Sequence, residues 1–220
     1  MNIKKTLLPL IIIFIGWNCY SQNDTSDNKY FSIGSKTAGI CFGNSRNFNG
    51  LRLSLWDLES NHGFKESERI NGINISFAVV SSVMNGLQIG GIGTYTKRMN
   101  GLSIASIWQN SDKMNGVAAS FGIDSDTLNG LFVGFGLSSP RRNIDNRVIN
   151  GLAIGVFVGA EKIRGVAIGL GESYSKKQIG ISVSALNKTE ELHGLQIGLL
   201  NYAGNNPRLF RWLPLINFHL

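Results

Sequence analysis

The stretch "MNGLQIGGIGTYTKRMNGLSIASIW" (residues 84–108) contains the unit Met-Asn-Gly-Leu-x-Ile twice, fifteen residues apart. The pattern continues along the chain when the glycine of each Asn-Gly pair, or its equivalent, is taken as position zero. Ten register glycines result: Gly50, Gly72, Gly86, Gly101, Gly116, Gly130, Gly151, Gly165, Gly180 and Gly194. They are 14 or 15 residues apart, except for intervals of 22 and 21 residues after Gly50 and Gly130. A fixed period of this kind indicates a fold built from repeated structural units.

Each unit has the side-chain pattern of a β-strand. The position after the glycine is Leu, Ile or Val in all ten units, and the position two further on is so in nine, with Ala119 as the exception. The fourth position after the glycine is always Gly, Ser or Ala. Alternation with a period of two indicates a strand rather than a helix. Asn precedes the glycine in seven units, and this pair favours a bend at the start of the strand.

Two all-β folds are consistent with one strand per unit. In the preferred interpretation, successive strands form an antiparallel up-and-down meander that closes into a barrel of about 12 strands. In the alternative, each unit is one coil of a parallel β-solenoid. The barrel is favoured because the face opposite the aliphatic residues carries almost no charge and no second alternating run is visible in each unit. The alternating end "RWLPLINFHL" (residues 211–220) is also typical of outer-membrane barrels.

The two long intervals argue against the barrel. They contain residues 56–70 and residues 138–149, which an antiparallel meander would place at opposite ends, whereas outer-membrane barrels usually keep long loops on one side. A solenoid has no such constraint. In either fold these two segments are the candidate contact regions, because loops are where binding residues concentrate.

A barrel predicts different environments for the two faces. The aliphatic face would point outward into lipid, and closure would satisfy the backbone hydrogen bonds. The other face would line a wet lumen with the polar residues Arg52, Asn74, Gln88, Ser103, Ser182 and Gln196. The small residues on that inner face favour a narrow, packed interior over an open pore.

The amino-terminal residues 1–21 have the features of a secretory signal peptide. Lys4 and Lys5 precede an apolar run over residues 7–16, which is too short to cross a bilayer as a helix. We expect cleavage after Ser21, with lipidation of Cys19 as the alternative. The protein would then be exported to the outer membrane or the cell surface.

The mature chain is predicted to be a single domain. Residues 22–29 form a short polar segment, and residues 30–220 form one β domain built from the repeated unit. Cys41 is the one cysteine left after removal of the leader, so no internal disulfide is expected. The formal charge of +7 includes two leader lysines, and the remaining basic residues are scattered, which argues against nucleic-acid binding.

The sequence contains no catalytic, cofactor or metal motif with the required spacing. The glycine-rich segments 90–93 and 169–173 coincide with strand positions of the unit and lack the lysine of a phosphate loop. Three histidines, His62, His193 and His219, lie far apart and lack a nearby ligand at metal spacing. The acidic run at 124–126 is expected to be a solvated turn.

The units "MNGLQIG" (84–90) and "LHGLQIGLLNYAGN" (192–205), with the closing "LPLINF" (213–218), resemble a glycine-rich surface-repeat family of exported proteins in double-membraned bacteria. The resemblance extends from about Asn49 to Leu220, and it implies surface or outer-membrane association without an assigned reaction. The segment 176–186 departs from the pattern.

These observations predict a non-enzymatic outer-membrane or cell-surface β-protein, structural or channel-like, with membrane lipid as its expected partner. The alternative is a soluble or lipid-anchored β-solenoid that binds a surface protein or a polysaccharide. Neither requires a cofactor.

Overall fold

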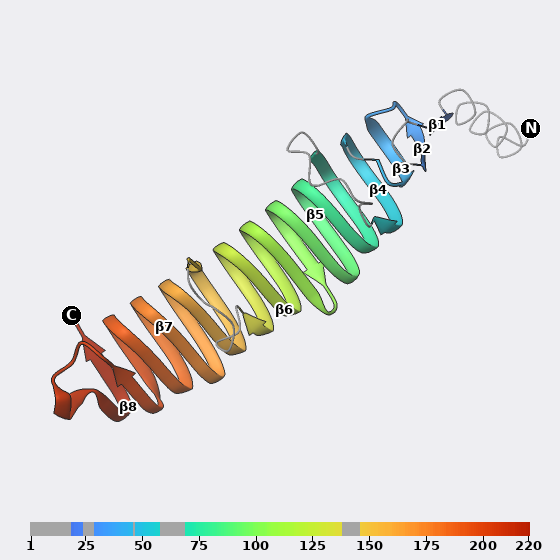
Figure 1. The fold of residues 1–220 in the computed structure, drawn as a ribbon. Helices are drawn as coiled ribbons and strands as arrows, with labels where there is room; N and C mark the ends of the chain where they lie inside the picture. Colours follow the sequence, from blue (N-terminus) through green and yellow to red (C-terminus); the bar gives the residue numbers. More distant parts are fainter. Residues whose placement is uncertain (1–18, 24–28, 46, 58–68, 138–145) are drawn as a thin grey trace, which may run out of the picture.

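The computed structural model describes residues 19–23, 29–45, 47–57, 69–137 and 146–220, and these form an all-β protein. Eight strands form one sheet in chain order: β1 (Cys19–Asn23), β2 (Lys29–Gly34), β3 (Ala38–Gly43), β4 (Asn47–Asp57), β5 (Arg69–Ala105), β6 (Trp108–Leu137), β7 (Val148–Ala203) and β8 (Trp212–His219). A 3₁₀ turn, η1, spans Arg208–Phe210. Figure 1 shows the chain winding as an elongated coil, with β2 and β8 near its opposite ends.

The register glycines lie in adjacent, parallel turns of this coil. Gly50 pairs with Gly72 between β4 and β5, and Gly130 pairs with Gly151 between β6 and β7. The strands β5, β6 and β7 are long because the chain runs through more than one turn without a break in pairing. One turn therefore takes 14 or 15 residues where no long segment intervenes. The sheet is mixed, since β1–β2, β2–β3 and β7–β8 pair antiparallel.

The prediction of a closed antiparallel barrel is wrong. Within the described residues, β1 pairs only with β2 and β8 pairs only with β7, so the sheet is open, and its central strands are parallel as in the alternative solenoid. Where the second half of a unit lies within β5, β6 or β7, it is also a strand. There Thr94 and Thr96 are buried on either side of the more exposed Tyr95. This run alternates in burial but not in hydrophobicity, so a search for alternating apolar residues misses it.

The two long intervals occupy equivalent positions of the coil. The described chain stops seven residues after Gly50 and again after Gly130, and the next strands begin at Arg69 and Val148, each three residues before a register glycine. The described residues that flank the two intervals therefore lie on the same side of the coil. The difficulty of long segments at opposite ends, which applied to the barrel, does not arise in the solenoid. Residues 58–68 and 138–145 of the predicted contact regions lie outside the described residues.

The register glycines form a column that no other residue could occupy. Their φ angles lie between 121° and 142°, a region that side chains with a Cβ rarely adopt. A Cβ on Gly116 would lie 2.1 Å from the carbonyl oxygen of Gly101, and equivalent clashes recur along the column. The predicted bend is thus confirmed at the glycine.

Asparagines form a ladder beside the glycine column. The ladder consists of Asn49, Asn71, Asn85, Asn100, Asn115, Asn129 and Asn150. From Asn71 onward, each amide Nδ2 donates to the Oδ1 of the asparagine one turn earlier, at 2.7–2.8 Å. Arg164, Ile179 and His193 occupy the next three equivalent positions, so the ladder ends there.

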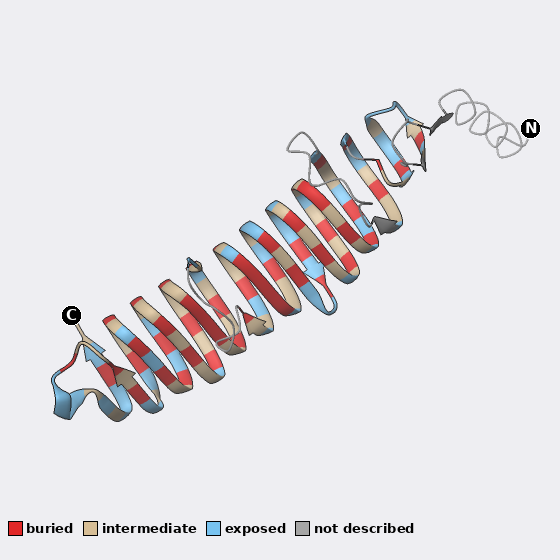
Figure 2. Cartoon of the chain, in the orientation of Figure 1, coloured by how far each residue is buried: buried red, intermediate tan, exposed pale blue. Residues whose placement is uncertain are grey.

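The interior of the coil is narrow and consists of columns of like residues. One column, two positions before the register glycine, is mostly apolar and buried: Phe48, Ile70, Met84, Met99, Met114, Leu128, Ile149, Ile163 and Leu192. Figure 2 shows the resulting alternation of buried and more exposed positions along each turn.

A second interior column, two positions after the glycine, is polar at both ends and apolar in the middle. Its central members are Ala118, Phe132, Ala153 and Ala167, and its outer members are the six polar residues predicted to line a wet lumen. All six are almost fully buried, so the lumen prediction is wrong. Arg52 is 1% exposed, and it donates from Nε to Asn74 Oδ1 at 2.9 Å and from a terminal nitrogen to the Ser45 carbonyl at 2.6 Å.

The carboxyl-terminal end of the coil is covered by β8 and a group of buried asparagines. Asn187 donates to Asn201 at 2.7 Å, and Asn206 donates to Asn217 at 2.8 Å. Pro214 in β8 has no backbone N–H, which limits pairing of this edge with another strand. The strand that suggested barrel closure therefore ends the solenoid instead.

The glycine column gives the first prediction. The substitution Gly116→Ala should lower the free energy of unfolding by at least about 2 kcal/mol, because the new methyl group meets the Gly101 carbonyl and the φ of 124° becomes strained. Urea unfolding followed by circular dichroism measures this. Gly136→Ala is the control, since a Cβ there meets nothing within 4 Å. Equal stabilities of the two variants would contradict the close approach.

Candidate functional site

The most unusual feature of the surface is a face of exposed aliphatic side chains. We define the aliphatic face as the outward positions one, three and five residues after each register glycine, with their pairing partners in β3 and β8. Its more exposed large members include Ile73, Ile75, Phe77, Leu102, Ile104, Val117, Phe121, Val133, Phe135, Ile181, Val183, Ile197 and Leu199. The predicted outward orientation of these residues is confirmed, although the barrel is wrong.

The aliphatic face is continuous along the solenoid. Ile40 in β3 pairs with Leu51, and Ile216 in β8 pairs with Ile197, so the end strands extend the same surface. None of the thirty positions in the ten units carries a charged residue. A charge-free surface of this kind requires a functional or structural explanation.

Aromatic rings strengthen one side of the aliphatic face. The rings of Phe121 and Phe135 stack with centroids 4.7 Å apart, and Phe157 meets Phe135 edge-on at 5.8 Å. Stacking between successive turns fixes these rings relative to one another. This part of the face is therefore preorganised.

The size of the aliphatic face can be estimated from strand geometry. Its rows comprise β3, the ten units and β8, and neighbouring strands are about 4.8 Å apart, so the face is roughly 55 Å long. Three outward positions about 7 Å apart make it roughly 14 Å wide, which gives an area on the order of 800 Å². Monomeric soluble proteins rarely expose a contiguous apolar patch of more than a few hundred Å².

Apart from the buried Arg52, the charged residues described within the ten units lie in the return halves of the turns, and some of them pair across turns. Arg147 lies 2.7 Å from Asp124 in a pair that is largely shielded from solvent. The acidic run at 124–126 was predicted to be a solvated turn, and this is wrong for Asp124, which is buried within β6. The pair ties the start of β7 to the preceding turn after the long interval.

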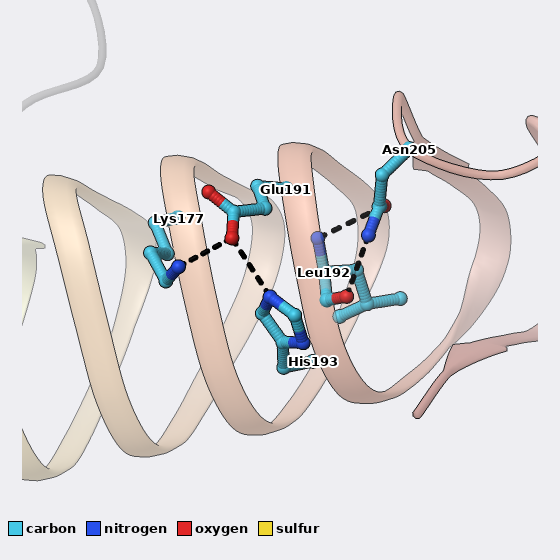
Figure 3. A network of polar contacts seen from close by, with 5 residues as sticks. All are labelled: Lys177, Glu191, Leu192, His193 and Asn205. Carbon is cyan, nitrogen blue, oxygen red and sulfur yellow. Dashed lines mark hydrogen bonds and ion pairs between the residues drawn. The ribbon is translucent and has the colours of Figure 1, made fainter.

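A second charged cluster lies near the carboxyl-terminal end (Figure 3). The Lys177 ammonium and the His193 ring both contact Oε1 of Glu191, the latter at 2.8 Å. Beside them, Asn205 bonds both the N–H and the C=O of Leu192, at 3.0 and 2.9 Å. The hydrogen bonds from Lys177 and then His193 hold the pKa of the Glu191 carboxyl below its ordinary value of 4.5.

The structure changes the interpretation of two histidines. His193 and His219 lie in adjacent strands with ring centroids 6.0 Å apart, and His193 has a carboxylate partner that sequence reasoning did not identify. The sequence does contain a signal for this cluster. Lys177 and Glu191 have opposite charges and are 14 residues apart, which is one turn of the coil, and His193 is two residues from Glu191. No group of three candidate metal ligands occurs among the described residues, and His62 lies outside them.

The remaining candidates have structural roles. Cys41 is fully buried in β3. The glycine-rich segments 90–93 and 169–173 lie within β5 and β7, as predicted. Among the described residues, no helix is long and apolar enough to cross a bilayer.

Comparisons with known proteins leave the aliphatic face as the main indication of function. No protein family, curated protein or solved structure matches this chain.

The charged cluster predicts a pH dependence. Because the pKa of Glu191 is lowered in the folded protein, its stabilising effect is complete above 4.5 and is lost as the pH falls through the folded pKa. The stability difference between the wild type and Glu191→Gln should therefore be largest at neutral pH and shrink in acid. Urea unfolding at neutral pH and well below 4.5 measures it. A difference that is independent of pH would rule out the assigned ionisation.

Proposed function

We propose that this protein is a non-enzymatic, exported β-solenoid of the outer membrane or cell surface, and that its aliphatic face contacts lipid. The observation that carries the proposal is the charge-free aliphatic face, exposed over twelve consecutive rows of strands. The leader-like residues 1–21 support export. Contact would be made by one face lying on the membrane.

The architecture suits contact with hydrocarbon. Between the end strands, neighbouring turns pair the backbone behind the aliphatic face, so this part of the face presents few unpaired backbone groups to the apolar phase. Burial of half the face would gain on the order of 10 kcal/mol at about 25 cal/mol per Å², before the costs of association. A shallow contact is therefore sufficient.

The charged residues support a binding role rather than catalysis. Lys177 with Glu191, and Arg147 with Asp124, pair across turns and stabilise the stack. The proposal accordingly assigns no reaction and no cofactor.

A second candidate function uses the same face for a protein or polysaccharide at the cell surface. The even spacing of its rows favours it, because a repetitive flat surface matches an extended, repetitive partner. The two candidates differ in whether pure lipid is sufficient for binding.

Vesicle flotation tests the lipid proposal. The purified chain should float with phosphatidylcholine vesicles, and Ile104→Glu combined with Ile181→Glu should weaken binding at least about tenfold, because two carboxylates would have to enter the apolar layer. Both residues lie on the aliphatic face and are 42% and 41% exposed.

The control is a pair of changes in η1, Leu209→Glu and Phe210→Glu, since these residues are exposed but lie outside the aliphatic face. They should leave flotation unchanged. Wild-type protein that stays unbound to vesicles would favour the second candidate. Control variants that lose binding equally would contradict the role of the aliphatic face in lipid binding.

A further inference from the structure

A concentration of positive charge lies on one edge of the solenoid, within β5 and β6. A hollow of about 380 Å³ is lined there by Arg69, Ser82, Val83, Lys97, Arg98, Asp112 and Lys113. We call these residues the basic hollow. Four basic residues and one acidic residue give it a formal excess of three positive charges. Such an arrangement attracts anions.

In the basic hollow, the position three residues before the register glycine is basic in two adjacent turns, and the flanking turns carry Val83 and Thr127 there. Arg98 pairs in register with Lys113, so two like charges stand side by side on neighbouring strands about 4.8 Å apart. Both lie three residues before a register glycine. At the same position further along the chain, Lys162 is also followed one turn later by a lysine, Lys177, but Lys177 forms an ion pair with Glu191 of the next turn.

The like-charged register pair costs stability, because equal charges directly opposite each other in a sheet repel. An anion between them would turn this repulsion into two favourable contacts. Arginine presents a planar fork that fits phosphate oxygens, and lysine supplies a compact charge. The shape and charge of the basic hollow therefore suit a phosphate group.

The position of the hollow connects it with the aliphatic face. Arg98 and Lys113 each precede the first aliphatic position of the next turn, Leu102 or Val117, by four residues. The three residues between them are a buried methionine, an asparagine of the ladder and the register glycine. An edge with basic side chains beside an apolar face places those charges at the level of lipid headgroups.

We propose that the basic hollow binds the phosphate of an anionic lipid headgroup while the aliphatic face contacts the acyl layer. This inference rests on the proposed lipid contact and adds selectivity for anionic membranes to it. The hollow would also fix the orientation of the solenoid on the membrane, because the basic excess lies on one edge of β5 and β6.

The test compares phosphatidylcholine vesicles with and without added phosphatidylglycerol at low salt. The wild type should prefer the anionic vesicles, and Arg98→Gln with Lys113→Gln should reduce that preference about 30-fold, from about 1 kcal/mol for each basic residue at an anionic surface. Binding to pure phosphatidylcholine should stay unchanged. The thermal midpoint should be unchanged or higher, since the change removes a repulsion.

The control is Lys162→Gln with Lys176→Gln, which removes the same charge outside the hollow, with Lys162 at the position of Arg98 and Lys113 and Lys176 at the position of Lys97. It should change the preference less than about threefold. Equal losses in both variants would overturn the hollow in favour of diffuse attraction, while binding to phosphatidylcholine would still support the lipid contact.

Failure of the lipid contact itself gives a different result. The wild type would then bind neither kind of vesicle, and both proposals for the membrane would fall. Calorimetry with inositol hexakisphosphate then tests whether the basic hollow binds a soluble phosphate compound instead of a lipid headgroup. Binding of this probe by the wild type but not by Arg98→Gln with Lys113→Gln, without vesicle binding, would replace the lipid headgroup by a soluble phosphate ligand.

Discussion

The close approach of backbones at the register glycines is the constraint on which the structure depends. At each corner, the carbonyl oxygen of one turn occupies the space that a Cβ of the next glycine would need. Neighbouring turns therefore stack with equivalent residues adjacent, as Gly101 and Gly116 do. The asparagine ladder follows from this register, because each amide can reach the same amide one turn earlier only when the turns do not slip.

Stacking in register repeats the chemistry of each position along the whole solenoid. An aliphatic residue at one outward position becomes an apolar face when it recurs in every turn, and a hydroxyl becomes a ladder, as Ser175 and Thr189 show at 3.0 Å. Charges cannot be repeated in this way without repulsion. Lys177, which follows Lys162 at the same position, is paired with Glu191, whereas Arg98 and Lys113 lie side by side with no acidic residue at that position in the flanking turns. Stacking in register thus brings aliphatic residues together in the aliphatic face. At the basic hollow it brings like charges together, which lowers the stability of the fold.

Much of this structure could be predicted from the sequence, but the parallel stacking of the turns into an open solenoid could not. The period, the bend at glycine and the outward aliphatic face follow from strict spacing and alternation. The sequence favours the barrel over the solenoid because inward residues of the return half, such as Thr94 and Thr96, are small and polar. Their burial leaves no hydrophobic signal. The pair Lys177 and Glu191 could have been found, since opposite charges one period apart meet only if the turns stack in parallel.

The narrow interior explains why large aliphatic residues lie outside. The fourth position after each register glycine is Gly, Ser or Ala, and where its side chain is buried, as in Ser76 and Ala105, no room remains for a larger one. Folding is therefore driven by the backbone ladder and by the apolar column that contains Met99 and Leu128. The hydrophobic free energy of the aliphatic face stays available in the folded monomer. A contact that removes this face from water would release it, and lipid requires no shape complementarity from the surface it covers.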